Sequence, residues 1–230
     1  MQQKVLVVFG YGPGISNAVA EKFGSEGFAV ALVARRREKV EAGVAALRAR
    51  GIRAEGFTAD VANPQQVRET FEQVRAKLGT ITAFEWTAYS GAAGDLLAAD
   101  SDELRSVFDV AVVGLTTAVQ AALPDLEKSE NAAILVTNGG LGLFDVNVDR
   151  AGVEWKAMGL SLANSAKHKL VRLLAQQLAA KNIFVGEVVV MGTVKGTAFD
   201  GGQATIEPTR VAEEFWSLYT QRKEHSALVS

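Results

Sequence analysis

A glycine-rich segment near the N-terminus has a composition and spacing that could bind a ligand. The segment "GYGPGIS" places Gly10, Gly12 and Gly14 between a short apolar run and an amphipathic one. Glycines let the backbone turn tightly and approach a ligand, and the free N–H groups of a following helix attract anions. The pattern therefore predicts a turn that binds the pyrophosphate of a dinucleotide, in preference to a plain connection.

Arginines follow the second apolar run of the chain. In "VARRRE", Ala34 precedes Arg35, Arg36 and Arg37, and the first acid is Glu38. An acid at this point would bind the ribose 2′-hydroxyl of NAD, whereas arginine binds phosphate through its planar fork. A solvated helix start is the other interpretation, although a positive cluster there opposes the helix dipole. We therefore expect NADP(H) to be favoured over NAD(H).

A lysine interrupts an apolar helical stripe in the segment "LSLANSAKHKL". Ala163, Lys167, Leu170 and Leu174 recur at helical spacing, whereas His168 falls on a polar stripe and is expected at the surface. A buried lysine needs a partner or a polar cleft. Lys167 is therefore expected inside a site.

Short apolar runs and amphipathic segments alternate along the chain and must position these residues. This order predicts parallel strands joined by helical crossovers, a Rossmann-type doubly wound sheet with helices on both faces, in one domain over residues 1–230. The predicted strands are 4–9, 28–34, 52–60, 81–88, 131–138, 183–192 and an edge strand at 226–230, and the predicted helices are 14–27, 37–51, 63–79, 101–126, 153–181 and 207–221.

Composition excludes several classes of protein. The chain has 230 residues, a formal net charge of −2 and no cysteine, which argues against nucleic-acid binding and excludes thiolate chemistry. Two histidines are too few for most histidine metal sites, and we expect no metal. No segment reads as a signal peptide or a membrane span, so we expect a cytoplasmic protein with no membrane partner.

Taken in order, these motifs resemble those of the short-chain dehydrogenase/reductase family over nearly the whole chain. "GYGPGIS" is similar to the family's G-x-x-x-G-I-G turn, with Ser16 in place of the last glycine. "ARR" resembles the NADP-preferring end of the second strand, and Asp60 with Val61 resembles the pair that contacts adenine. "WTAY" (86–89) falls where the family has N-N-A-G, and "MGTVKGT" (191–197) where it has P-G-x-V-x-T.

The resemblance implies a set of cofactor-binding residues drawn from these motifs. They are Gly10, Tyr11, Gly12, Pro13, Gly14, Ile15, Arg35, Arg36, Asp60, Val61, Thr87, Ala88, Lys167, Gly192, Val194 and Thr197.

The catalytic pattern of the family is only partly present. Its Y-x-x-x-K motif corresponds here to Ala163 and Lys167, its asparagine to Ala111, and its serine to the Asn138 position. Only the lysine matches, and the resemblance implies that it holds the nicotinamide ribose. Alanine cannot transfer a proton, so the donor would be Tyr89, Tyr11, Lys167 itself or ordered water.

We take Lys167, Tyr89 and Asn138 as the catalytic candidates. Tyr89 is favoured as the proton donor because it follows the fourth strand, although it could instead be a loop aromatic that packs beside Trp86.

Three functions remain open from the sequence. The first is an NADP(H)-dependent oxidoreductase that acts on a small carbonyl or alcohol by a non-standard mechanism. The second is a cofactor-binding regulatory or scaffold protein without catalysis. The third is an oligomerisation module whose nucleotide site is vestigial, as Ser16 suggests. Helices 101–126 and 153–181 are apolar on more than one face, which predicts a homodimer or homotetramer. The substrate is not predicted, but the loops at 143–155 and 191–208 should shape its site.

Overall fold

A seven-stranded parallel sheet forms the centre of the computed structural model, which describes residues 3–230. The strand order is β3-β2-β1-β4-β5-β6-β7, so the order reverses beside β1, as the doubly wound fold requires. The expected fold class is confirmed, including the edge strand at the C-terminus. The strands are β1 (Val5–Phe9), β2 (Ala29–Ala34), β3 (Ala54–Thr58), β4 (Ala83–Trp86), β5 (Ala133–Gly139), β6 (Phe184–Val190) and β7 (Ser226–Val229).

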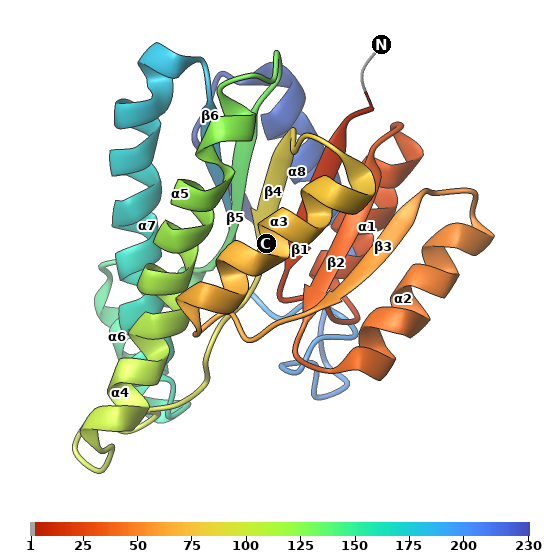
Figure 1. Ribbon diagram of the computed structural model, residues 1–230. Helices are drawn as coiled ribbons and strands as arrows, with labels where there is room; N and C mark the ends of the chain where they lie inside the picture. Colours follow the sequence, from red (N-terminus) through yellow and green to blue (C-terminus); the bar gives the residue numbers. More distant parts are fainter. Residues whose placement is uncertain (1–2) are drawn as a thin grey trace.

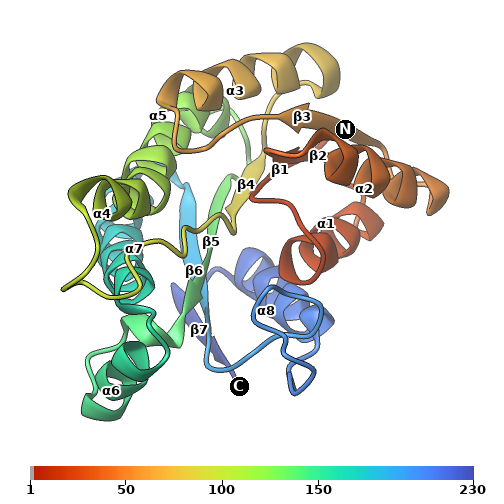
Figure 2. The same cartoon turned by 90° about the horizontal axis from the view of Figure 1, so that it is seen from below.

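Helices cover both faces of the sheet, as Figures 1 and 2 show. One layer contains α1 (Ile15–Ser25), α2 (Arg37–Ala49) and α8 (Pro208–Gln221), and the other contains α3 (Pro64–Leu78), α5 (Leu115–Leu126) and α7 (Met158–Leu178). Alternate residues of each strand belong to the two layers: Val7 and Phe9 pack toward α3 and α5, while Leu6 and Val8 pack toward α1 and α8. Burial on both faces explains why β1, β2, β5 and β6 read as largely apolar runs.

Capping residues fix two of the predicted helix starts. The Asn63 side chain accepts hydrogen bonds from the N–H groups of Gln65 and Gln66, and Pro64 occupies the first turn of α3. The Asp100 side chain caps α4 (Ser101–Phe108) in a reciprocal pair with Glu103. Both caps satisfy N–H groups that have no partner within the helix.

The predicted helix at 153–181 is wrong at its N-terminal end. The structure has two helices here, α6 (Val146–Glu154) and α7, which begins only at Met158. The Asp145 side chain starts α6 by accepting bonds from two backbone N–H groups, and Lys156 ends it with a left-handed φ of 49°. The expected substrate loop is therefore largely a helix.

The helical segment Ser101–Leu126 has the bounds expected from the sequence but is more irregular than one continuous α-helix. Asp109–Gly114 forms a π-helical stretch between α4 and α5. The whole segment has the length and hydropathy of a membrane span, contrary to our expectation that no such segment exists. However, half of its apolar window is buried inside the protein, and a core helix meets the same criteria.

Candidate active site

A cleft of about 1680 Å³ opens along the carboxyl edge of the sheet, the edge onto which Figure 2 looks. Its walls come from the segments that follow β1, β2, β3, β4, β5 and β6, together with α6 and α7. Doubly wound sheets bind ligands at this edge, beside the point where the strand order reverses. The cleft is therefore the place where the predicted residues can act together.

The cleft brings together nearly all the residues predicted from the sequence. Every predicted cofactor-binding residue lines it except Gly14, and the other two catalytic candidates, Tyr89 and Asn138, line it as well. Their binding and catalytic roles remain predictions, but they occupy one continuous surface.

Two glycines of the first turn are required by close packing. A Cβ on Gly10 would lie 2.5 Å from the backbone nitrogen of Ala88, and Gly10 has a φ of 83°. A Cβ on Gly14 would lie 2.8 Å from the Thr197 methyl carbon, at a φ of 98°. Glycine alone adopts such backbone conformations without strain. The turn is therefore packed between the loops that follow β4 and β6.

Ser16, which stands in place of the family's last glycine, forms hydrogen bonds within this turn. Its buried hydroxyl accepts a hydrogen bond from the Gly12 N–H (2.9 Å) and donates one to the Gly12 carbonyl (3.1 Å). Within residues 3–230, no side chain caps the start of α1, and its first turn carries no acid. Ile15 and Ser16 both line the cleft. The first N–H groups of α1 thus remain available to an anion.

Positive charge gathers at the end of the cleft beside β2. Arg35, Arg36 and Lys39 all line this end, and Arg35 and Arg36 are exposed. No ion pair within the described part of the chain engages either arginine. Two unpaired guanidinium groups beside an uncapped helix start form a surface suited to phosphate groups.

Lys167 lies buried at the floor of the cleft, as its helical stripe predicted. Its Nζ donates a hydrogen bond to the carbonyl oxygen of Thr137, at 2.9 Å. Burial lowers the pKa of Lys167 to about 8, and the charges of Glu187 and Glu85 partly oppose this shift. An ammonium group with this pKa keeps its proton at neutral pH yet releases it more readily than an ordinary lysine.

Two fully buried glutamates accompany Lys167 from opposite faces of the sheet. Glu85 belongs to β4 and accepts hydrogen bonds from the hydroxyls of Thr137 (2.6 Å) and Thr87. Burial raises the pKa of Glu85 to about 7, against the effect of the two threonine bonds and of Lys167. Its Oε2 has no hydrogen-bond partner among residues 3–230. The carboxyl group is thus close to its protonation midpoint at neutral pH.

Glu187 on β6 is held by groups from β5 and α7. The Asn138 Nδ2 donates to Glu187 Oε2 (2.8 Å) and to the Asn164 carbonyl (3.1 Å). The Nδ1 of His168 contacts Glu187 Oε1. The expectation that His168 lies at the surface holds only in part: its side chain is 33% exposed, but the ring also contacts this buried carboxylate, because α7 packs closely on β6.

Sequence reasoning missed both glutamates, although a signal for them was present. They stand within "AFEW" and "FVGEVVV", strands that are otherwise apolar. A carboxylate in a strand covered on both faces needs partners. Such acids, beside a lysine predicted to be buried, indicate a polar network in the core.

Ala163 does not face the cleft. It is buried one turn before Lys167 and packs with Ala93, Val107 and Ala111. The N–H of Gly159 donates to the Ala93 carbonyl (2.9 Å), which holds the start of α7 against the loop after β4. Small apolar groups therefore fill the space beside Ala163, and none of them can transfer a proton.

Tyr89 lies at the mouth of the cleft. Its ring packs against Phe199, with the centroids 5.4 Å apart. Tyr89 is thus a packed loop aromatic, as the alternative expected, but its ring partner is Phe199, whereas Trp86 is fully buried beside Phe9 in the core. Partial burial raises the pKa of Tyr89. The pKa of Tyr11 is also raised, mainly by burial and to a lesser extent by the negative charge of Glu21.

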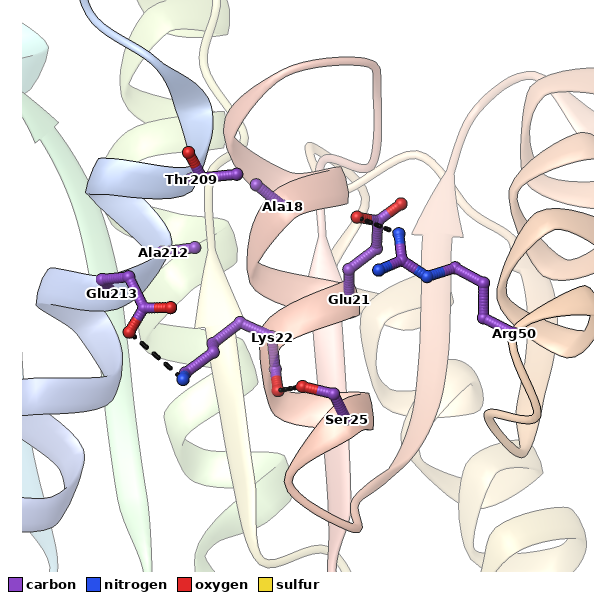
Figure 3. Close-up of a pocket in the computed structure, with 8 residues that line it drawn as sticks. All are labelled: Ala18, Glu21, Lys22, Ser25, Arg50, Thr209, Ala212 and Glu213. Carbon is purple, nitrogen blue, oxygen red and sulfur yellow. Dashed lines mark hydrogen bonds and ion pairs between the residues drawn. The ribbon is translucent and has the colours of Figure 1, made fainter.

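A second, much smaller pocket of about 170 Å³ lies between α1 and α8 (Figure 3). Its charged side chains pair with one another: Lys22 with Glu213 at 3.1 Å, and Arg50 with Glu21 at 2.5 Å. Such mutually neutralised surface pairs leave little charge for a ligand. We therefore place the chemistry in the large cleft.

Comparison with known proteins agrees with this architecture. Residues 4–205 match the model of the family described as short chain dehydrogenase. The chain belongs to that family. Among relatives of this short-chain dehydrogenase, the peroxisomal 2,4-dienoyl-CoA reductase of Arabidopsis thaliana is 26% identical over 224 residues, which cover 94% of the chain and 72% of that protein.

Solved structures of other family members share its fold. An NADPH-bound short chain oxidoreductase from Pseudomonas aeruginosa PAO1, described as containing an atypical catalytic center, has a TM-score of 0.85 at 24% identity, covering 100% of this chain and 97% of its own. The L-sorbose reductase of Gluconobacter frateurii, complexed with NADPH and L-sorbose, has a TM-score of 0.86 at 21% identity, covering 100% and 96%.

Proposed function

We propose that this short-chain dehydrogenase is an NADP(H)-dependent oxidoreductase that interconverts a small carbonyl compound and its alcohol by hydride transfer. One observation carries the proposal. A single cleft joins the uncapped start of α1, the unpaired Arg35 and Arg36, and the buried ammonium group of Lys167. Phosphate recognition and a proton-active group thus share one site.

The donors that line the cleft fit NADP(H). The N–H groups at the start of α1 would bind its pyrophosphate, and Arg35 with Arg36 would bind the 2′-phosphate. Asp60 and Val61 would lie beside the adenine, and Lys167 would hold the nicotinamide ribose. When bound, the nicotinamide supplies or accepts the hydride. The NADPH complexes among the structural neighbours support this assignment.

The proton in this proposal comes from Lys167. In the reducing direction the carbonyl carbon gains a hydride and the carbonyl oxygen gains a proton from Nζ, which leaves a neutral amine that solvent reprotonates. The pKa of about 8 suits this exchange near neutral pH. Tyr89 is the second donor to test, because it lines the same cleft. Asn138 would act indirectly, by holding Glu187 beside the lysine.

A cofactor-binding protein without turnover is the second function that a specific observation favours. Ala163 and its apolar neighbours offer no proton beside Lys167. In this alternative the site binds NADP(H) and the protein acts as a sensor or scaffold.

Two measurements test the proposal. Binding of NADPH is followed by its fluorescence and by thermal shift, with NADH as the comparison. Turnover of a panel of aldehydes and ketones is then measured, with Tyr89→Phe and Lys167→Met beside the unaltered protein. NADPH binding with turnover lost in Lys167→Met supports the oxidoreductase. Binding without any turnover favours the sensor, and no binding of either NADPH or NADP⁺ refutes both functions.

We also propose a cytoplasmic homo-oligomer. Leu173 on α7 and Val113 beside α5 are exposed apolar residues on the two long helices, which lie side by side in Figure 1. A partner subunit that covered them would remove apolar surface from water. A native mass equal to the 24.4 kDa of one chain would contradict this assembly. Cell fractionation tests the location.

A further inference from the structure

We propose that the substrate is a neutral carbonyl compound with a bulky aromatic or aliphatic group, and that carboxylated or phosphorylated substrates are disfavoured. This inference rests on the proposed oxidoreductase function and names the chemical class that the site accepts. Its basis is the uneven distribution of charge and apolar surface along the cleft.

Charged residues occur almost entirely at the cofactor end of the cleft. Arg35, Arg36 and Lys39 lie there, together with Asp60. Beyond that end, Lys167 is the one charged residue that lines the cleft within residues 3–230. Lys167 is already placed between two buried glutamates, which compensate its charge. An anionic substrate would find no free cation here.

The opposite part of the cleft has an apolar wall built from separate segments. The loop after β4, the π-helical stretch, the segment after β5, α6, α7 and the loop after β6 each contribute to it. The large apolar residues of this wall are Tyr89, Val110, Leu141, Val148, Trp155, Leu160, Met191 and Phe199.

Several of these side chains are strongly exposed. Trp155 is 68% exposed, Phe199 52%, Tyr89 41% and Met191 40%. Exposed aromatic surface gathered around one cleft indicates a binding site, because covering it removes apolar area from water. Their common position at the mouth favours a ligand with a ring or a branched chain.

The charged residues of α6 near the mouth of the cleft do not contribute to this apolar wall. Asp149, Arg150 and Glu154 belong to α6 but do not line the cleft, whereas Asn147, Val148 and Ala151 of the same helix do. Burying a carboxylate or phosphate without a partner is unfavourable, because the charge loses its hydration. The wall thus selects against charge as well as for apolar bulk.

A matched substrate pair tests the inference. Benzaldehyde and 4-carboxybenzaldehyde share the reacting group and the ring, and differ in one charge. We expect kcat/KM with NADPH to be at least roughly tenfold higher for the neutral aldehyde, since ~1.4 kcal/mol corresponds to a factor of ten. Equal values, or a preference for the carboxylate, would overturn the inference.

Matched variants locate the effect in the cleft. Phe199→Ala and Trp155→Ala each remove a wall aromatic, whereas Phe144→Ala removes one that is 95% exposed and does not line the cleft. We expect the first two to raise KM for benzaldehyde several-fold and the third to leave it unchanged. An equal response of all three would contradict the assigned wall.

The inference stays testable if turnover is absent. Saturation-transfer NMR then compares benzyl alcohol with 4-carboxybenzyl alcohol on the protein, with and without NADPH. Preferential transfer to the neutral alcohol, reduced by Phe199→Ala, supports the substrate class even where catalysis fails. Equal or stronger transfer to the carboxylate refutes it. NADPH titration of the same sample decides the cofactor assignment separately.

Discussion

Glu85→Gln should stabilise the protein at alkaline pH and lose this advantage as the pH falls. The folded protein holds the Glu85 carboxyl group in its interior, with a pKa raised from 4.5 to about 7 by burial. The folded state therefore resists ionisation of this group more than the unfolded chain does. The resulting penalty is absent below pH 4.5, grows between pH 4.5 and about 7, and is complete above that range.

The size of the effect follows from the two pKa values. The shift from 4.5 to about 7 corresponds to roughly 3 kcal/mol, because one unit is about 1.4 kcal/mol. Glutamine keeps the oxygen that accepts from Thr87 and Thr137, but its amide would occupy the position of the unpartnered Oε2. An unsatisfied amide costs about 1–3 kcal/mol at every pH. Only the pH-dependent part therefore reports the buried charge.

Urea unfolding at several pH values measures this part directly. We compare the unfolding free energy of Glu85→Gln with that of the unaltered protein. As the pH rises from about 5 to about 8.5, this difference should change by about 2 to 3 kcal/mol in favour of the variant. In a protein of this size that amounts to very roughly 5–10 °C in Tm. Glu224→Gln, which removes an exposed carboxylate, serves as the control. A difference that does not change with pH would refute the argument that burial raises this pKa.

Three further substitutions test the cleft and its turn. Lys167→Met should abolish turnover. Because burial lowers the pKa of Lys167 from 10.5 to about 8, the charged lysine destabilises the folded state below pH 8, and this destabilisation vanishes toward pH 10.5. The difference in unfolding free energy between the variant and the unaltered protein should therefore become smaller between these two pH values. Replacing Arg35 and Arg36 together by alanine should weaken NADPH binding more than tenfold while NADH binding changes little. If titrations show that the affinities for NADPH and NADH fall equally, these arginines do not bind the 2′-phosphate. Gly14→Ala should lower the unfolding free energy by about 1–3 kcal/mol, because Gly14 has a positive φ and an added Cβ would lie 2.8 Å from the Thr197 methyl carbon. An unchanged urea unfolding curve would show that this strain is absent.

The sequence predicted the elements whose local signals are strong. The inner strands β1, β2, β5 and β6 were found because burial on both faces makes them largely apolar runs, and Asn63 with Pro64 marked the start of α3. The break between α6 and α7 was missed because Lys156 stops the helix through a left-handed backbone conformation. Neither glycine nor proline marks that position.

The chemistry of the site was predictable only where a single residue carries the signal. The stripe that contains Lys167 indicated burial, and the structure has that burial. The pKa of the lysine could not be predicted, because burial lowers it and the charges of Glu187 and Glu85, which lie far away in sequence on two strands, partly oppose that shift. The contact of His168 was missed for the same reason: its partner, Glu187, lies on a strand that is distant in sequence.

The packing around Ala163 limits the size of the side chain that position 163 can accommodate. Ala93, Val107 and Ala111 surround the alanine, and the backbone bond from Gly159 to Ala93 holds the adjoining loop in place. A tyrosine at this position would have to displace several of these groups at once, at an overpacking cost of about 1–3 kcal/mol or more. Several neighbouring groups would thus have to move together before position 163 could accept a large side chain. Placing a tyrosine at position 163 by design would require coordinated changes in the loop after β4, in α4, in the π-helical stretch and in α7.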